Sequence, residues 1–447
     1  MVKVGLVAAL CAVALASCTV GPDYARPENA APARFGEKAP AADGGIAFTA
    51  DAPDQAWWSN LGDPLLAELV GRAAANNQQL AAAKARVREA RALHTVSDAS
   101  TDPRIDLFAV AWELDIFGGG RRSVEAAGAR YDAAVESARD VLLLVAAEVA
   151  RNYVELRADQ RRMGLAESTI ELQKRFAERT RNKLSSGLAL EYDVVGADAQ
   201  LKASQADIPR LRARIAAAAH RIGVLTGDQP TALVDRLTAS RPLPAAPDIV
   251  PVGLPSDLMK RRPDIRRTER ALHAATAEIG VATADLFPRF SLTGTVGLRG
   301  SRFSDLFMAD SVVWRIGAGI LMPLFNRERL YGQVAAANAR ADGALAEHRQ
   351  TVLQALEEVE SNLVRYAQGQ IRRRELESAV RDSRRALQLA RDLYDRGLKD
   401  IVHVLTAQRA LTENTEALIA TEAAAMQDLV ALYKALGGGW SQIDVMT

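Results

Sequence analysis

The sequence predicts an α+β membrane protein with two tandem structural repeats, each joining a very long helical hairpin to transmembrane β-strand segments. Three observations predict this class. The two halves of the 447-residue chain resemble each other at a constant offset. Each half contains a proline-free stretch far longer than a typical globular helix. In the second half, this helical pattern is interrupted by alternating apolar and small or polar residues.

The N-terminus has the layout of a lipoprotein signal. An apolar core over residues 5–14 is too short to span a bilayer. Leu15-Ala16-Ser17-Cys18 resembles a bacterial lipobox, which implies a signal peptide over 1–17 and acylation of Cys18. The alternative is an ordinary signal peptide with an incidental cysteine. Since Cys11 would leave with the signal, the mature chain would contain no disulfide.

The internal repeat has an ungapped offset of 210 residues. Tyr153 corresponds to Leu363, Gly187 to Gly397, and Gly227 to Gly437. Such a match over one long segment indicates two copies of one unit. The predicted divisions are a lipid-anchored leader over 18–56, a first repeat over 57–240, a proline-rich linker over 241–262, a second repeat over 263–440 and a tail over 441–447. The leader is rich in Ala, Pro and Gly, so we expect it to be extended and irregular.

Each copy predicts an antiparallel helical hairpin. Residues 121–186 and 328–396 contain apolar residues at three- and four-residue steps and no proline. A helix of this length would span about 100 Å. After Gly187 and Gly397, the chain would turn and return as helices over 191–226 and 400–436. A cytoskeletal coiled coil is the alternative, which the lipobox and the strand signals disfavour.

Two strands are predicted within 287–325. Phe290, Leu292, Val296 and Leu298 alternate with small or polar residues, and Trp314 to Met322 repeats the pattern. Alternation over about ten residues is typical of strands in a membrane β-barrel. A soluble hairpin packed on helices would show the same pattern. Because open edges are not tolerated in lipid, two strands per copy would require several chains to close a barrel.

The composition argues against several functional classes. Lys+Arg total 56 and Asp+Glu total 55, so there is no basic surplus for a nucleic-acid partner. The five His lack metal-ligand spacing. No catalytic arrangement stands out. We therefore expect no enzyme activity, no cofactor and no metal site.

Six motifs resemble the TolC-like outer-membrane factor family, and in particular its lipoprotein efflux branch. They occur in the family's order along essentially the whole mature chain. The motifs are Cys18-Thr19-Val20-Gly21-Pro22-Asp23-Tyr24, Trp57-Trp58 with Gly62-Asp63-Pro64-Leu65-Leu66, Asn76-Asn77 with Leu80, Trp112-Glu113-Leu114-Asp115-Ile116-Phe117-Gly118, Arg261-Arg262-Pro263-Asp264-Ile265, and Pro323-Leu324-Phe325-Asn326.

The resemblance implies a homotrimer with a shared twelve-strand barrel and a helical tunnel. It implies a lipid-anchored protein of the bacterial outer membrane that extends into the periplasm. Its partners would be a periplasmic adaptor, an inner-membrane pump, often of the resistance-nodulation-division type, and outer-membrane lipid. The implied function is the passive outer-membrane channel of a tripartite efflux system.

The first copy departs from the family pattern. Leu80 to Phe117 spans 37 residues, whereas Ile265 to Phe325 spans 60, a deficit of 23. Only residues 102–117 remain for a first hairpin, so one strand or two stubs are expected. A non-conducting envelope scaffold therefore stays open as an alternative, as does a type I secretion duct.

The family pattern also implies residues at the closed periplasmic end. Asp193 and Tyr394 match a pair that forms a latch between the hairpin tips, and Lys399 matches a basic residue that bridges hairpins. His403 and Thr406 occupy the positions of an acidic constriction, so that ring is missing or rebuilt. A ring of His403 could respond to pH near 6–7. The adaptor would contact the tips at Gly187, Leu188, Gly397 and Leu398. Ordinary exposed helix-end residues are the alternative for all of these.

Overall fold

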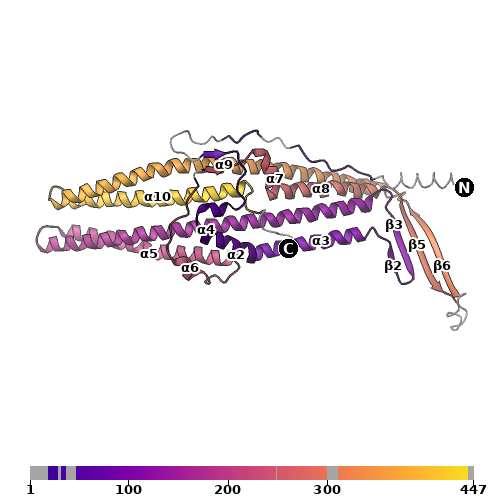
Figure 1. Cartoon of the computed structure of the whole chain (residues 1–447), viewed down its shortest axis with the longest axis horizontal. Helices are drawn as coiled ribbons and strands as arrows, with labels where there is room; N and C mark the ends of the chain where they lie inside the picture. The colour runs from indigo at the N-terminus through magenta and orange to yellow at the C-terminus, as the bar shows by residue number, and fades with distance from the viewer. Residues whose placement is uncertain (1–18, 29–31, 37–46, 248, 300–310, 441–447) are drawn as a thin grey trace.

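The protein is an elongated bundle of helices with a β-sheet at one end (Figure 1). A computed structural model describes residues 19–28, 32–36, 47–247, 249–299 and 311–440. The signal segment, Cys18, residues 300–310 and the tail over 441–447 lie outside the described residues. None of the described helices combines the length and apolarity needed to cross a membrane.

Two antiparallel helical hairpins form most of the length, as the sequence predicts. The first comprises α4 (Gly119–Ser185) and α5 (Glu191–Leu225). The second comprises α9 (Arg327–Asp395) and α10 (Ile401–Ala435). With 67 residues, α4 is about 100 Å long. Both hairpins point the same way in Figure 1, so their tips lie together at the end remote from the sheet.

Two helices of 22 residues pack beside the sheet-proximal halves of α4 and α9. These are α3 (Gln78–Ala99), which packs on α4, and α8 (Pro263–Ala284), which packs on both. Before α3, a 3-10 turn (Trp57–Leu61) leads into α2 (Pro64–Asn76). The Asn77 side chain separates α2 from α3 because it accepts from the backbone N–H groups of Gln79 and Leu80.

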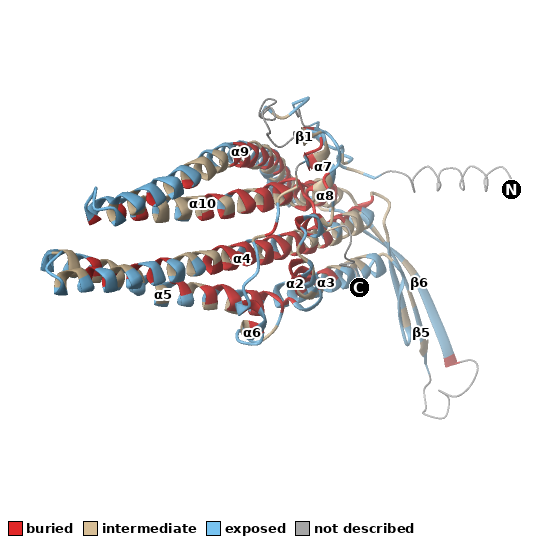
Figure 2. Ribbon diagram, turned by 60° about the vertical axis from the view of Figure 1, so that its left-hand side comes forward, coloured by how far each residue is buried: buried red, intermediate tan, exposed pale blue. Residues whose placement is uncertain are grey.

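The main apolar core lies midway along the bundle. Trp57 stacks on Tyr433 with ring centroids 5.4 Å apart, and its indole N–H donates to the Gly438 carbonyl. This contact joins the start of the first repeat to the end of the second. Figure 2 shows buried residues concentrated here, while the tips and strands are largely exposed. The middle therefore provides most of the packing within one chain.

The leader and the linker are more ordered than the composition predicts. In the leader, β1 (Ala47–Thr49) pairs in parallel with β4 (Ile249–Pro251) of the linker. An irregular leader was the wrong expectation at this point, because its backbone groups find partners about 200 residues away. Short helices complete this region: α6 (Val234–Thr238), a 3-10 turn (Pro255–Asp257) and α7 (Leu258–Arg261).

The strands form one antiparallel sheet in the order β2-β3-β5-β6. The second half supplies β5 (Arg289–Leu298) and β6 (Val312–Leu321), ten residues each. The first half supplies β2 (Arg104–Asp106) and β3 (Ala109–Leu114), of three and six residues. Of the two expectations for the shortened segment, the structure shows two stubs.

Candidate functional site

The sheet has two chemically different faces. Directly opposed residues project from the same face of an antiparallel pair, and the register aligns Val296 with Trp314 and Gly294 with Ile316. The other face carries mainly small and polar residues, with Thr295 opposite Arg315, although Val313 and Leu321 also lie on it. The apolar face comprises Ile105, Val110, Trp112, Leu114, Phe290, Leu292, Val296, Leu298, Val312, Trp314, Ile316, Ala318 and Ile320.

Within the described part of one chain, most of this apolar face is left uncovered. Trp314 is 72% exposed and Ile316 is 69% exposed. An exposed apolar patch of this extent would promote aggregation of a protein dissolved in water. With polar residues on the opposite face, the sheet is suited to a wall between lipid and an aqueous space.

The two hairpin tips share one turn geometry. Gly187 and Gly397 both adopt φ of 71°, a left-handed conformation that favours glycine. The following residues, Leu188 and Leu398, donate their N–H groups to Lys183 and Leu393 at 2.8 and 2.9 Å. Leu188 and Leu398 are 76% and 65% exposed. Each tip therefore presents an apolar side chain on a fixed turn.

Asp193 has a local role in one chain. Its carboxylate accepts the Leu190 N–H at 3.0 Å and so caps the start of α5. It also lines a groove of about 540 Å³ together with Thr406. In the described part of the chain, no hydrogen bond joins Asp193 to Tyr394. The implied pair is thus not formed within a single subunit.

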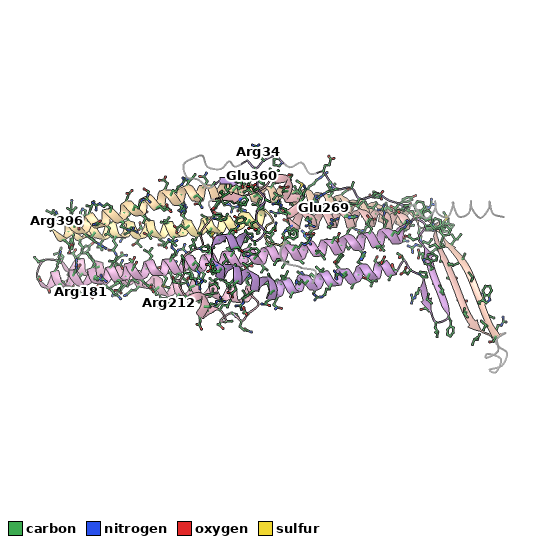
Figure 3. All side chains as sticks on the ribbon, viewed as in Figure 1. Arg34, Arg181, Arg212, Glu269, Glu360 and Arg396 are labelled. Atoms are coloured by element: carbon green, nitrogen blue, oxygen red, sulfur yellow. The ribbon has the colours of Figure 1, made fainter. Side chains whose placement is uncertain are left out.

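Tyr394 instead contacts the other hairpin of its own chain. Lys183 Nζ lies 3.7 Å from the centre of the Tyr394 ring, a cation–π contact. Phe176 lies 6.3 Å from the same ring, and the neighbouring Asp395 is 3.9 Å from Arg179. Figure 3 labels Arg181 and Arg396 near these two tips. Phe176 and Lys183 are seven residues apart, about two helical turns, so both lie on one face of α4.

The remaining predicted tip residues lie at the start of α10. Lys399 is exposed in the turn before Asp400. His403 Nδ1 lies 2.8 Å from Asp400 Oδ1, and this hydrogen bond holds the pKa of the Asp400 carboxyl below its usual value. The Thr406 hydroxyl donates to the Val402 carbonyl at 2.7 Å. Because the His403 side chain is exposed, it can contact solvent or another chain.

Residues 19–28 and 32–36 of the leader lie along the outside of the bundle and are called the strap below. Tyr24 stacks on His273 of α8 with ring centroids 4.3 Å apart, and Arg26 pairs with Glu269. Burial, together with the nearby Glu269 carboxylate, raises the pKa of Tyr24 to about 12. Further along, the Gly36 N–H donates to Glu360 of α9, near Arg34 in Figure 3.

The strap begins where the sheet joins the helices. The Val20 N–H donates to the Phe117 carbonyl at 3.1 Å. A Cβ on Gly118 would lie only 2.6 Å from the Thr19 side chain, so Thr19 is closely packed there. The first residues after Cys18 are therefore held at the base of the sheet.

Comparison with known proteins identifies the family. A family model described as "Outer membrane efflux protein" matches residues 107–228 and 254–438. The chain belongs to this family. It is 31% identical to Nodulation protein T of Rhizobium leguminosarum bv. trifolii, with 96% of each chain covered. It is 30% identical to outer membrane protein OprJ of Pseudomonas aeruginosa, covering 98% of this chain and 96% of that protein.

Solved structures of outer-membrane channels share the fold of this outer membrane efflux protein. The outer-membrane channel OprN matches with a TM-score of 0.89 at 35% identity, covering 95% of this chain and 100% of that one. The open state of the Neisseria gonorrhoeae MtrE channel matches with a TM-score of 0.83 at 26% identity, covering 96% and 100%. The protein is an outer-membrane channel component of an efflux system, as the sequence predicted.

Proposed function

We propose that three copies of this outer membrane efflux protein form a passive duct that exports small molecules to the exterior. One observation carries the proposal: the register gives a sheet with one continuous apolar face, joined directly to helices about 100 Å long. The apolar face would contact lipid, the polar face would line a wet lumen, and the helices would continue the duct through the periplasm.

The assembly is required because the sheet has two open edges. Among the described strands, β2 and β6 each pair on one side only. Unpaired backbone groups are not tolerated in contact with hydrocarbon, so both edges need partners, and neighbouring copies would supply them wherever their strands overlap. Three copies of the four-stranded sheet would supply twelve strands.

Acylation of Cys18 would anchor the same end of the molecule. Val20 is hydrogen-bonded to Phe117 at the base of the sheet, where the protein would leave the membrane. Acyl chains on Cys18 would therefore enter the bilayer beside the barrel, without strain on the strap. Growth on radiolabelled palmitate should label the wild-type protein; equal labelling of Cys18→Ser would contradict this site.

The adaptor would dock at the tips, and an inner-membrane pump would complete the system. Leu188 and Leu398 offer exposed apolar contacts on rigid turns. Photo-crosslinking residues placed at 188 and 398 should capture the adaptor. The same residue at Leu93, exposed on α3 near the sheet, should not. Equal capture from all three positions would contradict a tip site.

The closed state would be held by contacts between neighbouring chains. In this proposal the Tyr394 hydroxyl donates to Asp193 of an adjacent copy, and Lys399 pairs with an acidic or carbonyl partner there. His403 and Thr406 would line the constriction beyond this latch. Support comes from the position of these residues at the tips, and from the absence of a competing hydrogen bond on the Tyr394 hydroxyl among the described residues.

Conductance in planar bilayers tests the function. The purified trimer should insert and pass ions through discrete channels. The short first hairpin favours a second candidate, an envelope scaffold that does not conduct. A trimer that inserts stably and leaves the bilayer conductance unchanged would establish the scaffold and overturn the duct.

A further inference from the structure

The backbone of β6 leaves a long row of hydrogen-bonding groups at its free edge. Arg299 N–H donates to the Ser311 carbonyl at 2.7 Å, so odd-numbered residues of β6 direct their backbone groups toward β5. Even-numbered residues direct theirs to the free edge. The residues concerned are Val312, Trp314, Ile316, Ala318 and Ile320.

The opposite edge of the sheet is much shorter. Val296 N–H donates to the Phe108 carbonyl at 2.8 Å, which fixes the alternation across β3. The backbone groups of Arg104 and Asp106 therefore point toward β3. Ile105 is the residue of β2 whose backbone groups point to the free edge. The preceding Pro103 has no N–H to donate. At the boundary between two copies, here called a seam, one edge-facing residue of β2 would thus have to pair with five edge-facing residues of β6.

The turn of the first hairpin is also more apolar than expected for a loop exposed to water. Its residues Leu107 and Phe108 are apolar and are 87% and 60% exposed. Ten-residue strands match the span of a tilted membrane strand, whereas the six residues of β3 cover about half of it. In the proposed barrel, this hairpin would therefore end inside the hydrocarbon layer.

From these three features we infer that each seam between subunits is a lateral slot in the barrel wall; this rests on the trimer proposed above. Because unpaired backbone groups in the membrane need water or polar partners, the slot is filled by water and by the head groups of surrounding phospholipids. A head group accepts hydrogen bonds from the free N–H groups of β6, and its acyl chains lie against Leu107 and Phe108. The lumen is thereby open sideways to amphiphilic molecules in the membrane.

A lipid-borne thiol reagent tests the slot in the full-length trimer. The probe is phosphatidylethanolamine carrying an iodoacetyl group on its head, which is confined to the bilayer. Arg315→Cys places a thiol on the lumen-facing side of β6, beside the seam. Thr293→Cys places one on the same face of β5, away from the seam. Phe325→Cys, fully exposed at the sheet–helix junction, reports that the probe reacts.

We expect Arg315→Cys to react about tenfold faster than Thr293→Cys, because only the seam admits a head group through the wall. Lengthening the hairpin by the 23 missing residues, inserted between Leu107 and Phe108, should abolish that difference. If the cysteines at 315 and 293 react equally slowly while Phe325→Cys reacts, the slot is refuted. That result would mean that the seam is closed, either by strands of the neighbouring copy or by a strand from another protein.

The outcome is separable from the proposed function. A water-soluble maleimide should reach both 315 and 293 from the lumen of a trimer that conducts. If the protein is not a trimer, or if neither position accepts the soluble reagent, the duct itself is refuted. If the duct is present and the lipid reagent shows no preference, the slot alone is refuted.

Discussion

At the scale of single residues, the Tyr394 ring and hydroxyl have separable roles. The ring packs under Lys183 in the same chain, whereas the hydroxyl is the group that the latch requires. A substitution that keeps the ring therefore tests the latch without disturbing the cation–π contact.

Tyr394→Phe is expected to ease opening of the closed duct. Loss of a charge-assisted hydrogen bond worth about 1.5 kcal/mol would shift the opening equilibrium by about tenfold. Single-channel open probability and antibiotic permeability measure the change. Tyr192→Phe, at an 80% exposed site beside the tip, serves as the matched control. Unchanged values in both Tyr394→Phe and Asp193→Ala would remove the latch.

Buried His348 predicts a loss of stability in acid. Its Nδ1 lies 3.1 Å from the Thr268 hydroxyl, and burial lowers its pKa from the ordinary 6.5. Since the unfolded state takes up the proton first, the free energy of unfolding should fall as the pH drops below 6.5 toward the folded-state pKa. Unfolding of His348→Gln should lack this step, whereas half-exposed His220→Gln should retain it. An identical pH profile for wild type and His348→Gln would contradict the assignment.

At the scale of elements, Arg262 joins three helices. Its guanidinium pairs with Asp264 at the start of α8 and with Glu358 of α9 at 2.6 and 2.8 Å. It also donates to the Ala435 carbonyl at the end of α10. Opposite charges on both sides keep the pKa of Arg262 raised despite burial. One side chain thus ties the second repeat together at its midpoint.

Arg262→Ala should lower the free energy of unfolding by about 2 kcal/mol, because the Ala435 carbonyl loses its donor and Asp264 loses its counter-ion, while Glu358 keeps its pair with Lys434. Thermal unfolding followed by circular dichroism measures the loss. Arg236, which pairs with Glu68 on the surface, provides the control. Arg236→Ala should leave the midpoint unchanged. Equal effects of the two substitutions would show that burial of Arg262 is unimportant.

At the scale of the whole molecule, the sheet makes the chain dependent on its surroundings. Most of its apolar face and both open edges have no partner within the described chain, while the middle of the bundle is well packed. The helical part can therefore form in one chain, whereas in the proposed trimer the sheet would depend on lipid and on neighbouring copies. This division explains why a single subunit looks incomplete at one end only.

Ile316→Arg should impair insertion into the membrane. A cation on the lipid side of a barrel costs about 2–4 kcal/mol near the midplane. The yield of membrane-inserted trimer measures the effect. Thr293→Arg puts the same charge on the lumen side and should be tolerated. The face assignment would be wrong if the lumen substitution were the more damaging of the two.

Helix lengths, both glycine turns and the alternation in β5 and β6 follow from short-range patterns, so the amino-acid sequence by itself determined them. Contacts between distant segments were decided only by the tertiary structure. The pairing of β3 with β5, the strand in the leader, and the Lys183–Tyr394 contact all join residues separated by roughly 200 positions. The periodicity of a segment shows which of its residues share a face. Only three-dimensional packing decides which other segment that face contacts.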